Sequence, residues 1–161
     1  MKKAILLLLF SGIALTLASL EKKDFDRIVD FSLDIKGISK IVQAPGFNPA
    51  AHGRAVIFDG SVAGILVFNP DPAEFMAEIE VAGGEWEGLE NVSLFRVFVY
   101  VLGPDFAGRL ETPDSGSAAR ADAITMNCRL LIAGSLDSVY TDEADGKNYA
   151  IILAHYIRVI P

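Results

Sequence analysis

Apolar and polar residues alternate along most of this chain, and this alternation predicts a series of β-strands. Beyond the N-terminal apolar segment, no stretch keeps a helical period over two or more turns. Strands are expected where alternation or an apolar run is bounded by turn-forming residues. An all-β fold with a minor helical content follows. The expected strands are residues 28–36, 54–68, 75–82, 92–102, 124–140 and 149–160.

The expected strand at 54–68 has two interpretations because it contains Gly60 and Gly64. Glycine inside a strand indicates a bulge or a bend. Asp59 followed by Gly60 is also the signature of a tight hairpin turn. We favour one long bent strand, since a hairpin would leave a first arm shorter than an ordinary strand.

The connections between the strands follow from proline, glycine and polar residues. Gly37 ends the first strand, and residues 38–42 are expected to form one helical turn. Pro104 begins a short helix over residues 104–110, because proline is favoured in the first turn of a helix. A polar loop is expected over 111–123, and Asp145-Gly146 predicts a hairpin turn between the last two strands.

The order of these elements resembles that of exported bacterial OB-fold proteins. The resemblance depends on Gly60 and Gly64 in the first long strand, on the helix-like stretch PDFAGRL, and on the closing hairpin that begins at Cys128. It extends over residues 53–160 and leaves the strand at 28–36 as an addition. It implies a five-stranded OB-like barrel with a short helix between its third and fourth strands, and a binding module without a named ligand.

The strands at 75–82 and 92–102 are expected to pair as the central hairpin. The simplest register places Ala82 opposite Val92, and therefore Glu78 opposite Arg96. Side chains of a strand alternate between its faces, so the valines of 95–101 face the core. The opposite face carries Arg96, Phe98 and Tyr100 and is a candidate ligand face, since OB-folds bind ligands on these strands.

Each residue of this candidate site also has a structural interpretation. Arg96 could simply pair with Glu78 across the strands. Phe98 and Tyr100 could be covered by the N-terminal strand or by the loop 111–123, as large apolar residues in strands usually are. Trp86, in the expected turn, is either an exposed anchor for a ligand or a plug over the barrel mouth.

The N-terminus has the pattern of a cleavable export signal, with Lys2 and Lys3, an apolar run over 4–17, and small residues before a cleavage site after Ala18. The run is shorter than the roughly 20 residues that cross a bilayer. We expect residues 1–18 to be a signal peptide, 19–52 an extension with one strand, and 53–161 the barrel. The product would be periplasmic or secreted, with no membrane insertion after cleavage.

The acidity of the chain restricts its partners. Removing Lys2 and Lys3 leaves 12 of 14 basic residues against 21 acidic ones and moves the net charge from −7 to −9. An acidic chain without a basic run is repelled by phosphate backbones, so nucleic acid is not expected. The function expected is a non-enzymatic module that binds a protein or a small polar ligand through Arg96, Phe98, Tyr100 and Trp86. The alternative is a small barrel that carries an apolar ligand, as lipocalins do.

No catalytic or metal-binding pattern is present in the sequence. The single cysteine, Cys128, cannot form an intramolecular disulfide, and it alternates with apolar residues that face inward. The two histidines, His52 and His155, do not have the spacing of metal ligands. We therefore expect no cofactor and no enzymatic activity, and His155 is expected to be a hydrogen-bonded structural residue.

Overall fold

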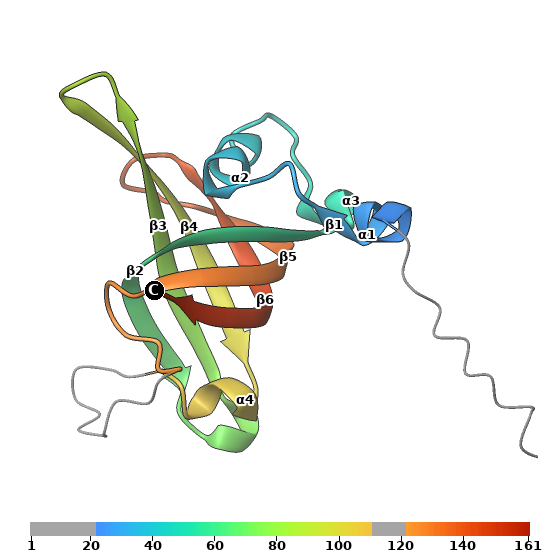
Figure 1. Ribbon diagram of the computed structural model, residues 1–161, viewed down its shortest axis with the longest axis vertical. Helices are drawn as coiled ribbons and strands as arrows, with labels where there is room; N and C mark the ends of the chain where they lie inside the picture. Colours follow the sequence, from blue (N-terminus) through green and yellow to red (C-terminus); the bar gives the residue numbers. More distant parts are fainter. Residues whose placement is uncertain (1–21, 111–121) are drawn as a thin grey trace, which may run out of the picture.

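The computed structural model describes residues 22–110 and 122–161 (Figure 1). The expected signal peptide and most of the expected loop at 111–123 lie outside these residues. Five strands form a barrel, and a sixth, very short strand adds to it. The elements are α1 (Lys22–Ile28), β1 (Val29–Asp30), α2 (Ile35–Ile41), α3 (Pro49–His52), β2 (Ala55–Asn69), η1 (Pro72–Glu74), β3 (Met76–Glu87), β4 (Asn91–Leu102), α4 (Pro104–Ala107), β5 (Arg129–Thr141) and β6 (Asn148–Ile160).

The barrel is closed by its longest strand, β2. The sheet order is β1-β2-β3-β4-β6-β5, and an additional pairing of β2 with β5 joins the two ends. The first half of β2 pairs with β5 and the second half with β3, and Ser61 is paired on both sides. The preferred interpretation of 54–68 as one bent strand is therefore confirmed. Closure by a shared first strand, with α4 between β4 and β5, also confirms the predicted OB-like fold.

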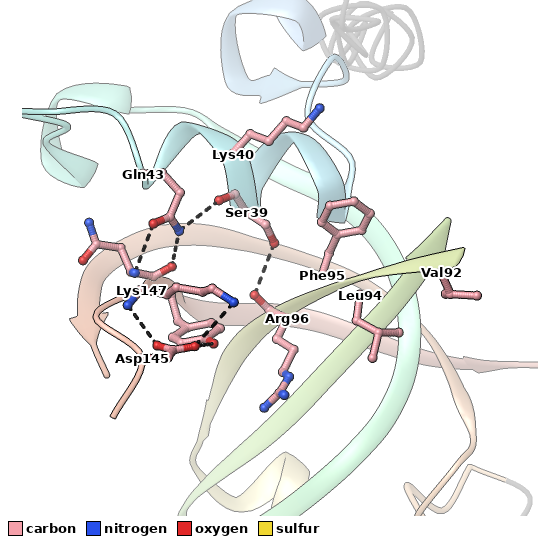
Figure 2. Close-up of a pocket in the computed structure, with 11 residues that line it drawn as sticks. Ser39, Lys40, Gln43, Val92, Leu94, Phe95, Arg96, Asp145 and Lys147 are labelled. Atoms are coloured by element: carbon pink, nitrogen blue, oxygen red, sulfur yellow. Dashed lines mark hydrogen bonds and ion pairs between the residues drawn. The ribbon is translucent and has the colours of Figure 1, made fainter. Parts of the chain in front are cut away.

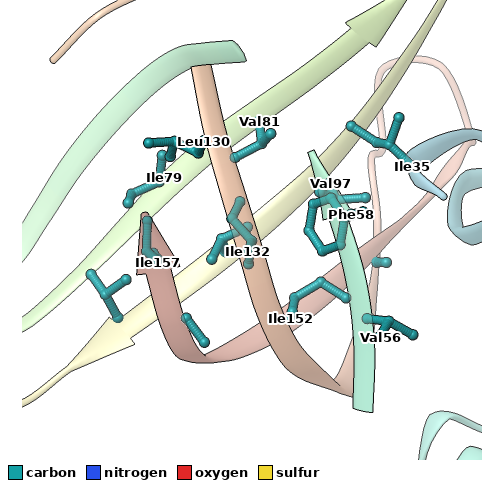
Figure 3. Close-up of a cluster of buried hydrophobic side chains, with 14 of the residues drawn as sticks. Ile35, Val56, Phe58, Ile79, Val81, Val97, Leu130, Ile132, Ile152 and Ile157 are labelled. Carbon is teal, nitrogen blue, oxygen red and sulfur yellow. The ribbon is translucent and has the colours of Figure 1, made fainter. Parts of the chain in front are cut away.

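Side chains fill the interior of the barrel (Figure 3). The inward residues of β3 and β4 include Ile79, Val81, Val97 and Val99, all with no exposed surface. They pack against Phe58 and the inward residues of β5 and β6. A lipocalin-like carrier needs a hollow interior, so this packed core contradicts the apolar-carrier alternative.

Helix α2 caps one end of the barrel, and α4 lies toward the opposite end (Figure 1). Ile35, Ile38 and Val42 point into the same hydrophobic core as the strands. The prediction of a strand over 28–36 is thus right only for Val29–Asp30, since Ile28 ends α1 and α2 begins at Ile35. The spacing of Ile35, Ile38 and Val42 fits a helix face, and the Asp34 carboxylate accepts a 2.7 Å hydrogen bond from the Gly37 N–H as the N-cap. The predicted boundary between the N-terminal extension (19–52) and the barrel domain (53–161) stays a prediction.

The segment before β5 also differs from its prediction. The strand expected from residue 124 begins at Arg129, because Asn127 adopts a left-handed conformation with φ of 66°. Ile124 instead forms an isolated parallel bridge with Leu110. Cys128 is consequently half-buried at the border of the core instead of lying fully inside it.

Asp30 is a buried carboxylate that joins the N-terminal segment to the barrel. Its side chain accepts hydrogen bonds from the Ser32 hydroxyl and backbone N–H and from the Arg54 guanidinium, the last at 2.5 Å. His52 Nε2 lies 3.7 Å from the same carboxylate. The Ser32 hydroxyl, with further help from its N–H and from Arg54, holds the pKa of Asp30 below its ordinary value, although burial opposes this.

Replacing Asp30 with asparagine is expected to destabilise the protein by about 2 kcal/mol at pH 7, because Arg54 loses a largely buried anionic partner. A lowered pKa stabilises the fold above the ordinary value of 3.8, and this contribution is lost as the pH falls through the lower folded pKa. Urea unfolding at pH 7 and at pH 3 measures both effects. The difference between D30N and the parent should shrink at pH 3, and D26N in exposed α1 is the matched control. An equal loss for D26N and D30N at pH 7 would contradict this role.

Candidate functional site

The strands β3 and β4 pair in a different register from the predicted one. Ala82 lies opposite Arg96, and Trp86 lies opposite Val92. The predicted register is wrong by four residues because the turn contains only residues 88–90, with Gly88 at φ of 76°. The shift is even, so the predicted faces are preserved: the valines point inward, while Arg96, Phe98 and Tyr100 point outward.

On this outer face, Arg96 pairs with an acid other than the predicted one. Its guanidinium lies 3.3 Å from Glu80 Oε1, and half of the arginine side chain is exposed. Tyr100, not Arg96, is opposite Glu78 and donates a hydrogen bond to it. Desolvation raises the pKa of Glu78, and the nearby Glu80 raises it further, while the Tyr100 hydrogen bond opposes the rise. The two acids therefore repel each other beside a cation that neutralises only one of them.

Phe98 and Tyr100 belong to an aromatic cluster that is half-buried by neighbouring strands. The Phe98 ring meets Tyr140 of β5 and Tyr149 of β6 edge to face, with centroid distances of 5.9 and 5.7 Å. Tyr100 meets Phe68 of β2 in the same way, at 5.9 Å. Among the described residues, β1 lies along β2 and does not cover these rings. Such packing holds the rings in place while leaving parts of them open to solvent.

A groove of about 530 Å³ lies beside this cluster, between α2, β4 and the loop that joins β5 to β6 (Figure 2). Its walls are fixed by hydrogen bonds between the two outer elements. The Gln43 amide and the Asn148 backbone exchange hydrogen bonds, and the Asn148 side chain donates to the Val42 carbonyl at 3.0 Å. The Ser39 hydroxyl donates to the Arg96 carbonyl at 3.3 Å. The lining residues are Ser39, Lys40, Gln43, Val92, Leu94, Phe95, Arg96, Asp145, Lys147, Asn148 and Tyr149.

The groove is locally basic in a chain with a net charge of −7. Its lining contains three cations, Lys40, Arg96 and Lys147, and one acid, Asp145. Lys40 forms no ion pair with any described residue. Asp145 is largely engaged: the Lys147 N–H donates to it at 2.9 Å and the Tyr149 hydroxyl at 3.0 Å, and the Lys147 ammonium lies 3.6 Å from it as an ion pair. The Lys147 N–H holds the pKa of Asp145 below its usual value, and Tyr149 adds to this.

Trp86 lies apart from the other predicted site residues. It is near the end of the β3–β4 hairpin, where 71% of its surface is exposed, and α2 rather than Trp86 caps the barrel. The structure thus brings Arg96, Phe98 and Tyr100 together and leaves Trp86 farther along the same face. The sequence analysis missed Lys40, Lys147 and Tyr149, because they come from segments about 50 and 100 residues apart.

The remaining candidates do not form a second chemical centre. His155 Nε2 lies 2.7 Å from the Ser135 hydroxyl, in agreement with its predicted structural role. Within residues 22–110 and 122–161, no three His, Cys, Asp or Glu side chains gather as metal ligands. Across the same residues, no helix is long and apolar enough to cross a membrane. The absence of enzymatic activity stays a prediction.

No protein-family model and no curated protein matches the chain. Solved structures match it at low identity. They include the wild-type single-stranded DNA binding protein of Thermus aquaticus (14% identity, 66% of this chain and 50% of that one, TM-score 0.42). A Plasmodium falciparum SSB complex with ssDNA matches at 13% identity over 66% and 94% of the two chains, with a TM-score of 0.44. The N-terminal domain of PriB from Thermoanaerobacter tencongensis matches at 17% identity over 66% and 96%, with a TM-score of 0.36.

This chain spans about half the length of the Thermus protein, and similarity at this level concerns the fold alone. The matched proteins are named for single-stranded DNA or as PriB, which contradicts the predicted module for a protein or small polar ligand. The exclusion of nucleic acid is also wrong, since it depended on net charge and overlooked the basic groove. The expected periplasmic or secreted localisation stays a prediction. The signal peptide itself lies outside the described residues, and its export role stays untested.

Proposed function

We propose that this chain binds single-stranded nucleic acid in the groove between α2, β4 and the β5–β6 loop. The observation that supports this proposal most strongly is the gathering of Lys40, Arg96 and Lys147 around one groove of an otherwise acidic chain. Cations concentrated in a cleft attract phosphate even when the whole protein is negative, because the local field decides where an anion binds. The charge and shape of the groove, rather than the similarity to known structures, support this proposal.

The groups of the groove suit the two parts of a nucleotide. The Lys40 ammonium can neutralise a phosphate and displace a counterion. Arg96 and Lys147 can do the same where a phosphate takes the place of their present partners, Glu80 and Asp145. The aromatic cluster of Phe98, Tyr140 and Tyr149 next to the groove offers ring surfaces on which bases stack. OB-folds use the second and third strands with the loop between the fourth and fifth for such ligands, and β4 and the β5–β6 loop are these elements here.

A single strand fits this surface better than a duplex. Stacking on protein rings requires bases that are free of their partner strand. A duplex also has a higher charge density and would bring more phosphates toward Glu78 and Glu80, which lie on the same outer face as Arg96. With three cations in the groove, the logarithm of the binding constant should fall with the logarithm of the salt concentration with a slope of about −2.

Fluorescence anisotropy of a labelled oligothymidylate of about 15 nucleotides tests this function, since OB-fold sites take about 4 to 16 nucleotides. The full chain should bind the single strand saturably, and the logarithm of its binding constant should fall with the logarithm of the salt concentration with a slope of about −2. It should bind a duplex of equal length at least tenfold more weakly. Absence of saturable binding at low salt would overturn the proposal. Equal affinity for both forms would overturn the assignment to single strands.

A further inference from the structure

The outer part of the β3–β4 hairpin extends beyond the barrel as a two-stranded ribbon (Figure 1). The pairing of β3 with β2 ends at Ala82, and the pairing of β4 with β6 begins at Val97. From these two points to the three-residue turn, residues 83–87 of β3 pair with residues 91–95 of β4. The ribbon therefore presents two faces and two strand edges outside the barrel.

One face of this ribbon is apolar. Gly84 lies opposite Leu94 and Trp86 lies opposite Val92, so these four residues share the outer face, which we call the apolar ribbon face. The exposed fractions are 71% for Trp86, 67% for Leu94 and 45% for Val92. Leu89, in the turn, is 97% exposed. Large apolar side chains gathered at one exposed place usually mark an interaction surface.

The charged residues of the two ribbon strands lie on the other face, and Glu90 lies in the turn. Glu85 and Glu87 lie opposite Ser93 and Asn91 on the second face. Glu85 forms an ion pair with Lys36, which follows the first residue of α2, and Glu87 accepts a hydrogen bond from Ser93. The apolar ribbon face therefore carries no charged residue, although the acidic residues of the chain are abundant.

We propose that the apolar ribbon face, with Leu89 at its end, is an interface between two copies of this chain. Two copies of an acidic chain repel each other except where they meet on an uncharged surface, and this face provides one. A flat apolar face is also self-complementary about a two-fold axis, with each Trp86 meeting the ribbon of the other copy. Two such sheets pack about 10 Å apart.

The available area fits a weak dimer. Complete burial of Trp86, Leu89, Val92 and Leu94 would remove roughly 600 Å² from water in each copy, at the lower end of specific interfaces. Tryptophan at the centre of such a patch contributes much of the binding energy. The interface goes beyond the proposed function and does not require it, but it shares Val92 and Leu94 with the lining of the groove, so the second copy and a nucleic acid compete for these residues. Added salt should strengthen this interface, because it screens the repulsion between the two acidic copies. Added salt should weaken phosphate binding, so the two proposals differ in the sign of their salt dependence.

The emission of Trp86, the only tryptophan, reports on this interface directly. As the concentration of the full chain rises through the micromolar range, the emission should shift to shorter wavelength, with the same midpoint as dimer formation in sedimentation velocity. Added NaCl should lower this midpoint. L89D should raise it at least tenfold. It should not weaken oligothymidylate binding, since Leu89 does not line the groove, whereas the dimer covers Val92 and Leu94, which do.

L66D is the matched control, because Leu66 is also exposed, at 54%, but lies on β2. Its midpoint should equal that of the parent. A Trp86 emission that stays constant at all concentrations would overturn the proposal, as would equal effects of L66D and L89D. If the chain stays monomeric and the Trp86 emission shifts when neutral phospholipid vesicles are added, the face is assigned to lipid instead. If the Trp86 emission shifts only when oligothymidylate is added, the face is assigned to the nucleic acid. Either of these two results would overturn the second copy as the occupant.

Discussion

Replacing Gly134 with alanine is expected to destabilise the protein by about 3 kcal/mol, at the upper end of overpacking in a closed core. An added Cβ would lie 2.5 Å from the Leu153 carbonyl oxygen and 2.7 Å from Ile152 Cγ2. The backbone has little room to move, because Gly134 pairs with Val56 of β2 on one side and with Ala154 of β6 on the other. It also lies where the register of β5 against β6 shifts, within the β2–β5 pairing that closes the barrel.

Urea unfolding followed by far-UV circular dichroism measures this effect. G64A is the matched control, since an added Cβ there would meet only the Glu80 side chain, at 3.3 and 3.4 Å, which can move aside. G64A should change the stability by less than about 1 kcal/mol. Equal stabilities for G134A and G64A would show that β2, β5 and β6 do not meet as tightly as described.

Reversing the three groove charges together, in K40E/R96E/K147E, is expected to weaken oligothymidylate binding about 100-fold at 0.1 M salt. Each substitution removes one phosphate contact and adds a carboxylate that repels the strand. The salt slope should also fall toward zero, since no counterions are then released. Anisotropy titrations at several salt concentrations measure both quantities.

The control for this variant changes the net charge equally but away from the groove. Lys22 and Arg27 lie on α1, and Arg158 lies on β6 beside a different cavity, lined also by Arg109 and Tyr156. K22E/R27E/R158E should weaken binding only a few-fold, through the long-range charge of the protein. If the two triple variants bind with equal affinity, overall charge rather than the groove governs binding.

The faces of the central strands could be predicted from the sequence, whereas their register could not. Alternation fixes which residues of β4 point inward, and Val97 and Val99 are fully buried as expected. The register depends on the turn, and Gly83-Gly84 is typical of one. Gly83 is instead required inside β3 because an added Cβ would lie 2.6 Å from Ile35 Cγ2 of α2. That close approach of a helix is a tertiary fact that no local pattern reveals.

The N-terminal segment shows the same limit. Val29, Leu33 and Ile35 alternate with polar residues, but Ile35 also fits a helical spacing with Ile38 and Val42. As a helix, this segment buries Ile35, Ile38 and Val42 in the open end of the barrel, and this burial favours the helix over the strand. Short apolar runs satisfy both periods, so tertiary packing overrides the pattern.

The candidate site was only half predictable for a related reason. Arg96 and Phe98 share one strand, so alternation alone places them on one face. Lys40, Lys147 and Tyr149 reach them only because α2 caps the barrel and β6 pairs in parallel with β4. A search for a basic run in the sequence cannot find three cations that the topology brings together.

The most direct measurement is a map of backbone amide chemical shifts in the full chain during titration with oligothymidylate. The groove account predicts saturable changes concentrated in residues 39–43, 94–100 and 145–149, with the amides of 156–159 at the other cavity unchanged. It is contradicted if no amide shifts at low salt, or if the changes lie outside these three segments.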